Sequence, residues 1–379
     1  MDLGAVPILD QHCHALLRDG AVADAATYAG FFTESGEPAM HAHHASETVF
    51  YRWAIRELSA FLGCAPTTES VLAARATMSA DALARRLLGE ANIAGLLVDH
   101  GYQTDKTWPP AELATRVPCR VWPILRLEVL AQTLIVQHAT LDAVLDAYSA
   151  VVERARAEGF VGLKSIIAYR TGLAVQPTSR DAAAEAFGPV KERARRDGRV
   201  RLATKPLNDY FLLRALEIAQ RQGLPVQIHT GFGDADLDLR ESNPLHLRPL
   251  LESGHYTNVP FVLLHASYPY VRELAYLAAV YANVHADVGL AIPHVAAEIP
   301  AMLRQLLGLA PTSKVVYSSD ASQIPELYWL AARWGRRGLG TVLDELVALG
   351  ALDAAQALEV GRRVLGGNAA RIYGLPWPS

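Results

Sequence analysis

The sequence has few features of a secreted, membrane-bound or disulfide-stabilised protein. Only three cysteines occur in 379 residues, at wide and irregular spacings, which excludes a disulfide framework and a cysteine-based zinc site. No run of about 18 apolar residues is present, and the start of the chain lacks a basic segment followed by an apolar one. These absences predict a cytoplasmic protein that is neither exported nor inserted into a membrane.

An excess of charge of either sign is also missing. The 35 Lys and Arg residues nearly balance the 39 Asp and Glu residues, and no basic stripe stands out, so nucleic acid is not an expected partner. Hydrophobic residues make up 51% of the chain, which is enough for a large core. The expected partner is a small-molecule substrate, and homo-oligomerisation is left open.

Eight short apolar, β-branched runs end in turn or polar residues and are therefore predicted as strands. They are Val6–His12, Ile93–Asp99, Arg120–Leu127, Val161–Ile167, Pro225–His229, Phe261–His265, Asn283–Val288 and Lys314–Ser319. Helical patterns such as "LDAVLDAYSAVVERARAEG" lie between most of them. Strands alternating with helices predict an α/β fold of parallel βαβ units, and eight units predict a distorted (β/α)8 TIM barrel.

Two regions exceed a minimal barrel. Residues 18–90 are mostly helical, follow the first predicted strand, and are predicted to be an insertion that caps the barrel mouth. The chain after Asp320 is also helical and would complete the outer ring. Neither a low-complexity linker nor an internal repeat is found, so residues 1–379 are predicted to form a single domain.

Polar residues interrupt or end five of the eight predicted strands. Because side chains alternate along a strand, the H-x-H pair of the first strand is expected to direct both imidazoles to the same side. Imidazole and carboxylate together suit zinc, or manganese or iron less selectively, with one position left open for water or substrate. A lone histidine at a strand end is most often a satisfied core residue, but so many together favour a metal site. The residues are His12, His14, Lys164, His229, His265 and Asp320.

Lys164 lies on an apolar strand, where an unpaired ammonium would be costly. One explanation is carbamylation, which would make the side chain a metal-bridging carboxylate. The other is an ion pair with Asp320 or with a substrate carboxylate. The residues alone leave both open.

The order H-x-H, Lys, His, His, Asp on successive strands resembles the amidohydrolase superfamily. Longer motifs, among them "GLKSIIAYRTGL", "VLLHASYPYVRELAYLAAVYANVHADVGLAIP" and "GGNAARIYGL", resemble its amidohydrolase-2 branch. Within that branch they are most similar to the amidohydrolase domain fused to a glutamine synthetase-like domain in plant nodulin-type and fungal developmental proteins. The synthetase-like domain is not in this sequence, which predicts a stand-alone version.

The resemblance implies a metal-dependent TIM barrel with His12 and His14 as ligands and His229 as a further or second-metal ligand. It implies that His265 is a ligand or stabilises an oxyanion, and that Asp320 binds metal and shuttles the proton. Lys164 occupies the place of the carbamylated lysine of two-metal members, whereas many members of the branch lack it and use one metal. One or two divalent ions, most simply zinc, are therefore expected.

The implied reaction is hydrolysis of an amide or a related C–N or ester bond by metal-activated water. Two alternatives stay open: non-oxidative decarboxylation, which also occurs in this branch, and a binding module without turnover. Other residues at strand ends or in the insertion are expected to contact substrate, and the arginines among them favour a carboxylate-bearing substrate. The same arginines could instead pair with Glu128 or Asp99. These candidates are His100, Arg126, Glu128, Tyr169, Arg170 and Arg52.

Three further patterns are given structural interpretations. "GFGDADLDLRESNP" lacks the spacing of a calcium-binding EF-hand and is predicted to be the loop after the fifth strand. "HAHH" at residues 41–44 is predicted to be a set of surface histidines, with contact between lid and substrate as the alternative. Cys13, between the two histidines, is expected to face the helix layer and to be structural.

Overall fold

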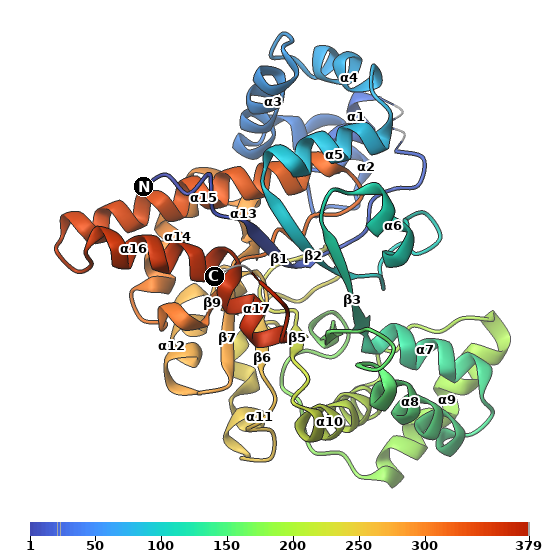
Figure 1. Cartoon of the computed structure of the whole chain (residues 1–379). Coiled ribbons are helices and arrows are strands. Elements are labelled where there is room, and N and C mark those ends of the chain that lie inside the picture. Colours follow the sequence, from blue (N-terminus) through green and yellow to red (C-terminus); the bar gives the residue numbers. More distant parts are fainter. Residues whose placement is uncertain (21, 23, 378–379) are drawn as a thin grey trace.

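The structure, a computed structural model, describes residues 1–20, 22 and 24–377. A sheet of eight parallel strands, in the order β1-β2-β3-β4-β5-β6-β7-β9, forms its centre (Figure 1). The strands are β1 Ile8–Cys13, β2 Ile93–Asp99, β3 Arg120–Arg126, β4 Gly162–Ser165, β5 Val226–Ile228, β6 Phe261–Leu263, β7 Val284–Asp287 and β9 Val315–Val316; β8, Gly289–Leu290, lies outside this sheet.

Individual backbone hydrogen bonds bring the two edges of the sheet together. Gln11 N donates to Tyr317 O at 3.3 Å, Asp320 N donates to His12 O at 3.0 Å, and His14 N donates to Ala321 O at 2.8 Å. The sheet is thereby a nearly closed barrel, as the eight apolar runs predict. Each strand falls within its predicted run to within one residue, and most strands are shorter than the run.

Helices surround this barrel on the outside (Figure 1). Those that follow β2 are α6 Pro110–Arg116, α7 Leu127–Gln137, α8 Leu141–Arg154, α9 Arg180–Asp197, α10 Lys205–Gln222, α11 Arg248–Glu252, α12 Val271–Val280, α13 Ala291–His294, α14 Ile299–Leu307, α15 Pro325–Ala348, α16 Ala354–Arg362 and α17 Asn368–Tyr373. Short turns of 3-10 helix are η1 Ala45–Glu47, η2 Ile167–Tyr169, η3 Pro244–Leu247, η4 His265–Ser267, η5 Ala296–Glu298 and η6 Thr312–Lys314; the π-helical turn η7, Arg363–Gly367, joins α16 to α17.

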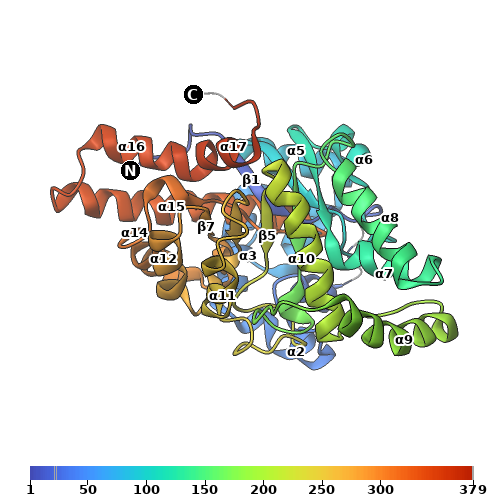
Figure 2. The ribbon, with the colours of Figure 1, turned by 90° about the horizontal axis from the view of Figure 1, so that it is seen from below.

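The predicted insertion between the first two strands is helical. It holds α1 Ala25–Gly30, α2 Pro38–His43, α3 Val49–Leu62, α4 Thr68–Ala76 and α5 Ala80–Glu90. Trp53 of α3 stacks on Trp334 of α15, with ring centroids 4.2 Å apart, and so fixes the insertion to the long C-terminal helix. Figure 2 shows α2 and α3 on one side of the barrel and α16 and α17 on the other.

Helix α17 closes the end of the barrel opposite the insertion. Its Ala369, Ala370, Ile372 and Tyr373 form one buried cluster with interior residues such as Leu9 of β1 and Leu97 of β2. Burial of this apolar surface removes it from water and ties the C-terminal helix to the barrel interior. The Tyr373 hydroxyl reaches farther in, to Gln11 of β1, at 2.6 Å.

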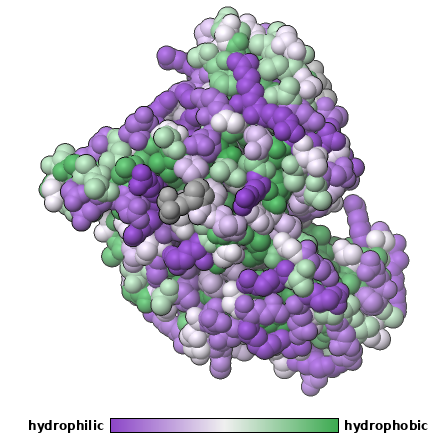
Figure 3. All heavy atoms as spheres, viewed as in Figure 1, coloured by the Kyte–Doolittle hydropathy of each residue, from purple (hydrophilic) through white to green (hydrophobic). Residues whose placement is uncertain are grey.

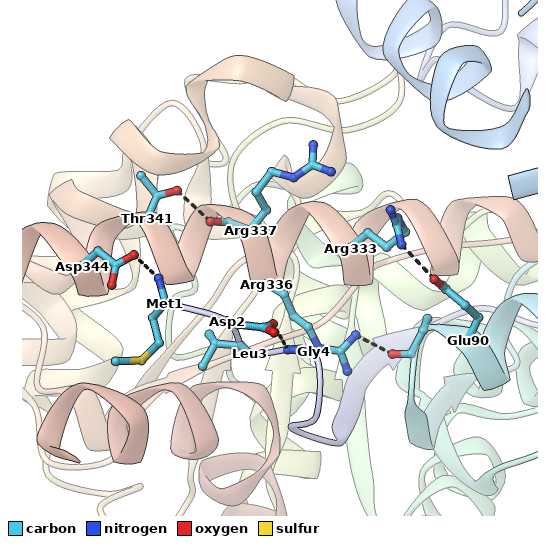
Figure 4. A pocket seen from close by; sticks show the side chains of 11 residues that line it. Met1, Asp2, Leu3, Gly4, Glu90, Arg333, Arg336, Arg337, Thr341 and Asp344 are labelled. Atoms are coloured by element: carbon cyan, nitrogen blue, oxygen red, sulfur yellow. Dashed lines mark hydrogen bonds and ion pairs between the residues drawn. The ribbon is translucent and has the colours of Figure 1, made fainter. Parts of the chain in front are cut away.

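Residues 1–4, which precede β1, pass along α15. A cavity of about 410 Å³ there is lined by one face of α15, including Arg333, Arg336 and Arg337 (Figure 4). Arg336 is 8% exposed and donates to Ala91 O at 2.5 Å and Val6 O at 2.7 Å. Arg336 therefore holds the starts of β1 and β2 against α15, while Arg333 and Arg337 both pair with Glu57.

On the face seen in Figure 3, apolar side chains lie in small patches between hydrophilic ones. None of the helices formed by the described residues is both long enough and apolar enough to cross a bilayer.

Candidate active site

Two histidines from the end of β1 converge on one carboxylate from the segment after β9. His12 Nε2 lies 3.0 Å and His14 Nε2 lies 3.3 Å from Asp320 Oδ1. The register of β1 against β2 shifts between Asp10 and Cys13, which places one extra residue on β1. Both imidazoles face the centre as predicted, and Cys13 Sγ instead contacts Leu97 O, at 3.5 Å.

The second ring nitrogen of each histidine is held by an oxygen acceptor. His14 Nδ1 lies 3.0 Å from the backbone carbonyl of Asp99, which can only accept, so the neutral ring carries its proton on Nδ1. His12 Nδ1 lies 2.8 Å from Gln227 Oε1. Burial, with the nearby Lys164 charge, lowers the pKa of His12 to about 4, so this ring is neutral at physiological pH.

His265, which directly follows β6, is the third histidine near the Asp320 carboxylate. Its Nδ1 lies 3.8 Å from Asp320 Oδ2, and the side chain is 1% exposed. Neither of its ring nitrogens has a hydrogen-bond partner among the described residues. His265, Ala266 and Ser267 all have positive φ, at 69°, 52° and 48°. Three successive non-glycine residues in this region are backbone strain, which is commonly found at functional sites.

Burial alone would raise the pKa of Asp320, but the adjacent His265, His12 and His14 hold it well below its usual range. The carboxylate is therefore ionised at neutral pH. Where the His12 and His14 rings carry their single proton on Nδ1, their Nε2 lone pairs face Asp320 Oδ1, which is an unfavourable contact between acceptors unless a cation lies among them. The donor set of His12, His14, His265 and Asp320 thus fits a divalent metal of the zinc type.

A second metal-compatible group, His12, His14 and Asp99, fits less well. The Asp99 carboxylate already accepts from Arg126 Nε at 2.8 Å and from Arg126 Nη2 at 2.6 Å. Burial would raise the pKa of Asp99, but Arg126 holds it well below the usual range, so the two form a stable ion pair. Arg126 is therefore an internal partner of Asp99, which is one of the two roles that its position predicts.

Lys164 lies beside the metal-compatible residues. Its Nζ is 3.1 Å from His12 Nε2, and no carboxylate of the described chain forms an ion pair with it within 4.0 Å. The direct ion pair with Asp320 predicted as one alternative is absent from this arrangement, although the Asp320 charge is near enough to act on Lys164. Burial lowers the pKa of Lys164 to about 8, against the opposing effect of Asp320 and Asp99.

We expect Lys164→Met to stabilise the metal-free protein by up to about 3 kcal/mol at pH 7. Below pH 8 the lysine is charged in both the folded and the unfolded state, so the folded state bears the full cost of burying it. Between pH 8 and 10.5 the unfolded chain binds more protons, and this cost disappears. Urea unfolding at pH 7 and pH 10 measures the effect. The exposed Lys106→Met is the matched control, and a destabilised Lys164→Met at pH 7 would contradict the assignment.

His229, at the end of β5, is brought close but is oriented differently. Its Nε2 lies 3.1 Å from Phe232 O, and its ring centroid lies 4.4 Å from that of His265. The carbonyl can only accept, so Nε2 carries the proton of the neutral ring. His229 therefore faces the metal-compatible group without offering Nε2 as a ligand.

These residues open into a cavity of about 670 Å³ at the carboxyl ends of the strands. Its lining includes His14, Lys164, His229, His265 and Asp320, together with the insertion residues Glu34 and His41. The insertion thus contributes to the cavity, and of the "HAHH" histidines His41 takes the alternative predicted role in its wall. A cavity of this size suits a small molecule.

Arg170 and Arg201 also line this cavity. Arg201 pairs with Asp236 Oδ2 at 2.5 Å, and Arg170 lies 3.9 Å from the same carboxylate oxygen. The Arg170 Nε is buried without a hydrogen-bond partner among the described residues. Tyr169, which the sequence predicts as a substrate contact, also lines the cavity. Arg170 is thus a poorly paired cation that faces the substrate space.

Three of the predicted substrate-contacting residues lie outside this cavity lining. Glu128 is buried and accepts from Ser165 Oγ at 2.7 Å, because α7 begins directly after β3 and turns this side chain into the barrel wall. Arg52 lies on the outer face of α3, 64% exposed, and pairs with Glu47. His100 is half-buried beside Asp99, and its Nδ1 has no partner within the described chain. Glu128, Arg52 and His100 therefore do not form part of the cavity wall.

Four residues at this site are not singled out by the sequence reasoning. Gln11 and Gln227 are polar residues in otherwise apolar strands, a signal of the same kind as that of Lys164. Glu34 belongs to the insertion, and its carboxylate lies 3.5 Å from His294 Nε2. Arg201 follows α9, and its nearness to the cavity depends on how α9 packs, which no local motif specifies.

Comparisons with known proteins agree with this geometry. The family model described as Amidohydrolase, of the amidohydrolase-2 branch, matches residues 138–375. The protein fluG of Emericella nidulans is 37% identical over 238 residues, which are 60% of this chain and 27% of fluG. The chain thus spans about a quarter of the length of that curated relative.

A presumed metal-dependent hydrolase from Lactobacillus casei has a crystal structure that matches with a TM-score of 0.88 and 33% identity, over 98% of this chain and 97% of that one. A uronate isomerase from Thermotoga maritima matches with a TM-score of 0.67 and 14% identity, over 98% and 95% of the two chains, which shows the shared barrel fold. The family match covers more than half of the sequence and includes His229, His265 and Asp320. This chain belongs to the amidohydrolase family, in its amidohydrolase-2 branch.

Proposed function

We propose that this protein is a metal-dependent hydrolase that cleaves an amide, or a related C–N or ester bond, in a small substrate bearing a carboxylate. The observation that carries the proposal is the convergence of His12, His14 and His265 on the Asp320 carboxylate at the base of the cavity. Membership of the amidohydrolase family supports it.

We propose that one divalent ion, most simply zinc, is bound by His12, His14, His265 and Asp320. Such an ion polarises a substrate carbonyl and lowers the pKa of water from 15.7 to about 7. His229 Nε2 is directed to Phe232 O and not toward a second ion, so we propose that Lys164 stays an amine and does not bridge two ions as a carbamate. His229 then lies beside the reacting groups and is not a ligand.

Asp320 is the proton carrier in this proposal. Its Oδ2 lies 3.8 Å from His265 and is not contacted by His12 or His14, so it can accept the proton of an attacking water. The same oxygen would return that proton to the leaving nitrogen, whose departure as an anion is unfavourable. The fixed positive φ of 53° at Asp320 and the bond from its N–H to His12 O hold the carboxylate in place.

Arg170 is the proposed partner of the substrate carboxylate. It faces the cavity and its nearest carboxylate, Asp236, is already taken by Arg201. Burial, together with the Arg201 charge, lowers the pKa of Arg170, and an incoming anion would relieve this cost. A forked guanidinium also orients a carboxylate by two parallel hydrogen bonds.

We expect Arg170→Met to raise KM about 10- to 100-fold and to change kcat little, because the interaction is present equally in the ground state and the transition state. Steady-state kinetics on a cleaved substrate measures this. The exposed Arg180→Met, whose guanidinium pairs with Asp142 on the surface, serves as control. A fall in kcat with unchanged KM would contradict the role of Arg170 in ground-state binding.

The reaction is tested on zinc-loaded protein with a panel of N-acetyl amino acids and γ-glutamyl amides. Release of a primary amine, dependent on added zinc and abolished by a chelator, is the expected result. An aromatic carboxylic acid panel assayed for carbon dioxide covers decarboxylation. Carbon dioxide release without amine release would contradict hydrolysis, and absence of both with zinc bound would favour a binding module.

A further inference from the structure

Two glutamines from opposite sides of the barrel interior meet a tyrosine below the metal-compatible residues. Gln227 of β5, Gln11 of β1 and Tyr373 of α17 are all buried, and both glutamines are 0% exposed. Gln227 Nε2 lies 2.6 Å from Gln11 O, 2.9 Å from Tyr373 Oη and 3.1 Å from Gln11 Oε1. A buried polar group of this kind is costly unless it is fully paired.

The neighbours of this group determine which way each side-chain amide points. The Gln11 backbone carbonyl can only accept, so the atom of Gln227 beside it must be the donating nitrogen. Gln11 Nε2 donates to the Asp287 carboxylate at 2.8 Å, so Gln11 Oε1 faces Tyr373 and accepts from its hydroxyl at 2.6 Å. Every donor in the group then meets an acceptor, and neither amide can be reversed without placing two acceptors or two donors together.

This orientation leaves Gln227 Oε1 facing His12 Nδ1 at 2.8 Å. The amide oxygen can only accept, so His12 carries its proton on Nδ1 and presents a lone pair at Nε2. The Nε2 atom is the one that faces Asp320 and Lys164. The neighbours of Nε2 oppose each other, because Lys164 Nζ at 3.1 Å can only donate and the Asp320 carboxylate at 3.0 Å can only accept. The acceptor at Nδ1 therefore decides between the two neutral forms of this ring.

The same hydrogen-bonded chain continues to His265. Asp287, which accepts from Gln11 through Oδ1, accepts through Oδ2 from the backbone N–H groups of His265 and Gly289, each at 2.9 Å. These bonds hold the first residue of the left-handed turn of residues 265–267. One buried chain therefore runs from the His12 ring to the His265 backbone.

We propose that Gln227, oriented by Gln11 and Tyr373, is a positioning residue that holds His12 in its Nδ1-protonated form and so keeps Nε2 available to bind the metal. Helix α17, which plugs the far end of the barrel, thereby contributes to the metal site through Tyr373. The proposal rests on the proposed metal binding by His12. Loss of a residue that hydrogen-bonds to a metal ligand typically weakens metal affinity 10- to 100-fold.

The first test measures the tautomer in metal-free protein, where neither metal nor turnover is involved. In wild-type protein labelled with 15N-histidine, we expect the His12 side-chain nitrogen shifts to show a protonated Nδ1 and a bare Nε2. The resonances are assigned by their loss in His12→Asn. In Gln227→Met, which is close in volume but cannot accept at that position, the His12 shifts should move to a mixture of both neutral forms.

The second test is the affinity for zinc, measured by competition with a chromophoric chelator. Gln227→Met should weaken binding about 10- to 100-fold. Tyr373→Phe keeps the ring in the plug and removes only the hydroxyl, with its hydrogen bonds to Gln11 and Gln227, so it should weaken binding about threefold to tenfold. Tyr148→Phe is the matched control, because the Tyr148 hydroxyl is equally buried but has no partner in the described chain, and it should leave affinity unchanged.

The proposal is overturned if Gln227→Met keeps the Nδ1-protonated form of His12, or if it binds zinc within twofold of wild type. Thermal unfolding of the metal-free variants shows whether any loss of affinity is merely a loss of fold. If wild-type protein bound no zinc, the proposed function would fail while the tautomer measurement would still test the role of Gln227.

Discussion

Asp320→Asn should lower kcat by about 100- to 10,000-fold while the protein keeps part of its metal. The amide cannot take up the proton of the attacking water, so the proton transfer is lost. The three histidine nitrogens remain in place, because His12 and His14 are oriented by Gln227 and the Asp99 carbonyl and not by Asp320. Metal content by elemental analysis and kcat on a cleaved amide measure the two effects.

Asp142→Asn is the control for this variant, since Asp142 is an exposed carboxylate on α8 that pairs with Arg180. It should leave both kcat and metal content unchanged. An Asp320→Asn variant with wild-type turnover would show that another group carries the proton, and the nearest candidate would then be His265.

His12→Ala should remove the metal and with it the activity, and it should leave the fold intact. Removal of a side chain that binds the metal should weaken metal affinity more than removal of a residue that only hydrogen-bonds to such a side chain. The latter loss is about 10- to 100-fold. The barrel is held by its apolar core and by Arg336, so the stability of the metal-free protein should fall by only about 1–2 kcal/mol at pH 7. Elemental analysis and urea unfolding measure these changes.

This variant should also change the dependence of stability on pH. In the metal-free wild type, the unfolded chain protonates His12 near pH 6.5, whereas the folded protein does so only at about pH 4. Stability is therefore fully present above pH 6.5 and is lost as pH falls through this window, by up to about 3 kcal/mol from His12. His12→Ala should lose less stability than wild type between pH 6.5 and 4. An equal loss would contradict the buried, neutral state of His12.

The barrel and its central residues could be predicted from the sequence because each depends on a local pattern. A short β-branched run that ends in a polar residue predicts a strand and places that polar residue at the carboxyl end of the strand. This pattern predicts Asp320 and His265 as site residues. The H-x-H spacing similarly predicted two imidazoles on one side. What this reasoning did not contain was the irregularity between Asp10 and Cys13 that brings Gln11 and His12 to the same partner, Gln227.

The substrate-facing wall was harder to predict, because it depends on contacts between distant segments. Arg126 ends β3 and Glu128 follows two residues later, but one pairs with Asp99 and the other turns into the barrel wall beside Ser165. Arg201 reaches the cavity from the segment after α9 and Glu34 from the insertion, and the positions of both follow from helix packing. Sequence patterns specify which residues end strands, and packing decides which of their neighbours meet the substrate.

The central claim is that His12, His14, His265 and Asp320 bind one divalent ion. The most direct test is a crystal structure of the zinc-loaded protein with anomalous scattering recorded at the zinc edge. We predict one anomalous peak per chain, in contact with these four side chains, and an unmodified Lys164. Two peaks bridged by a carbamylated Lys164, or a single peak away from these residues, would contradict the account.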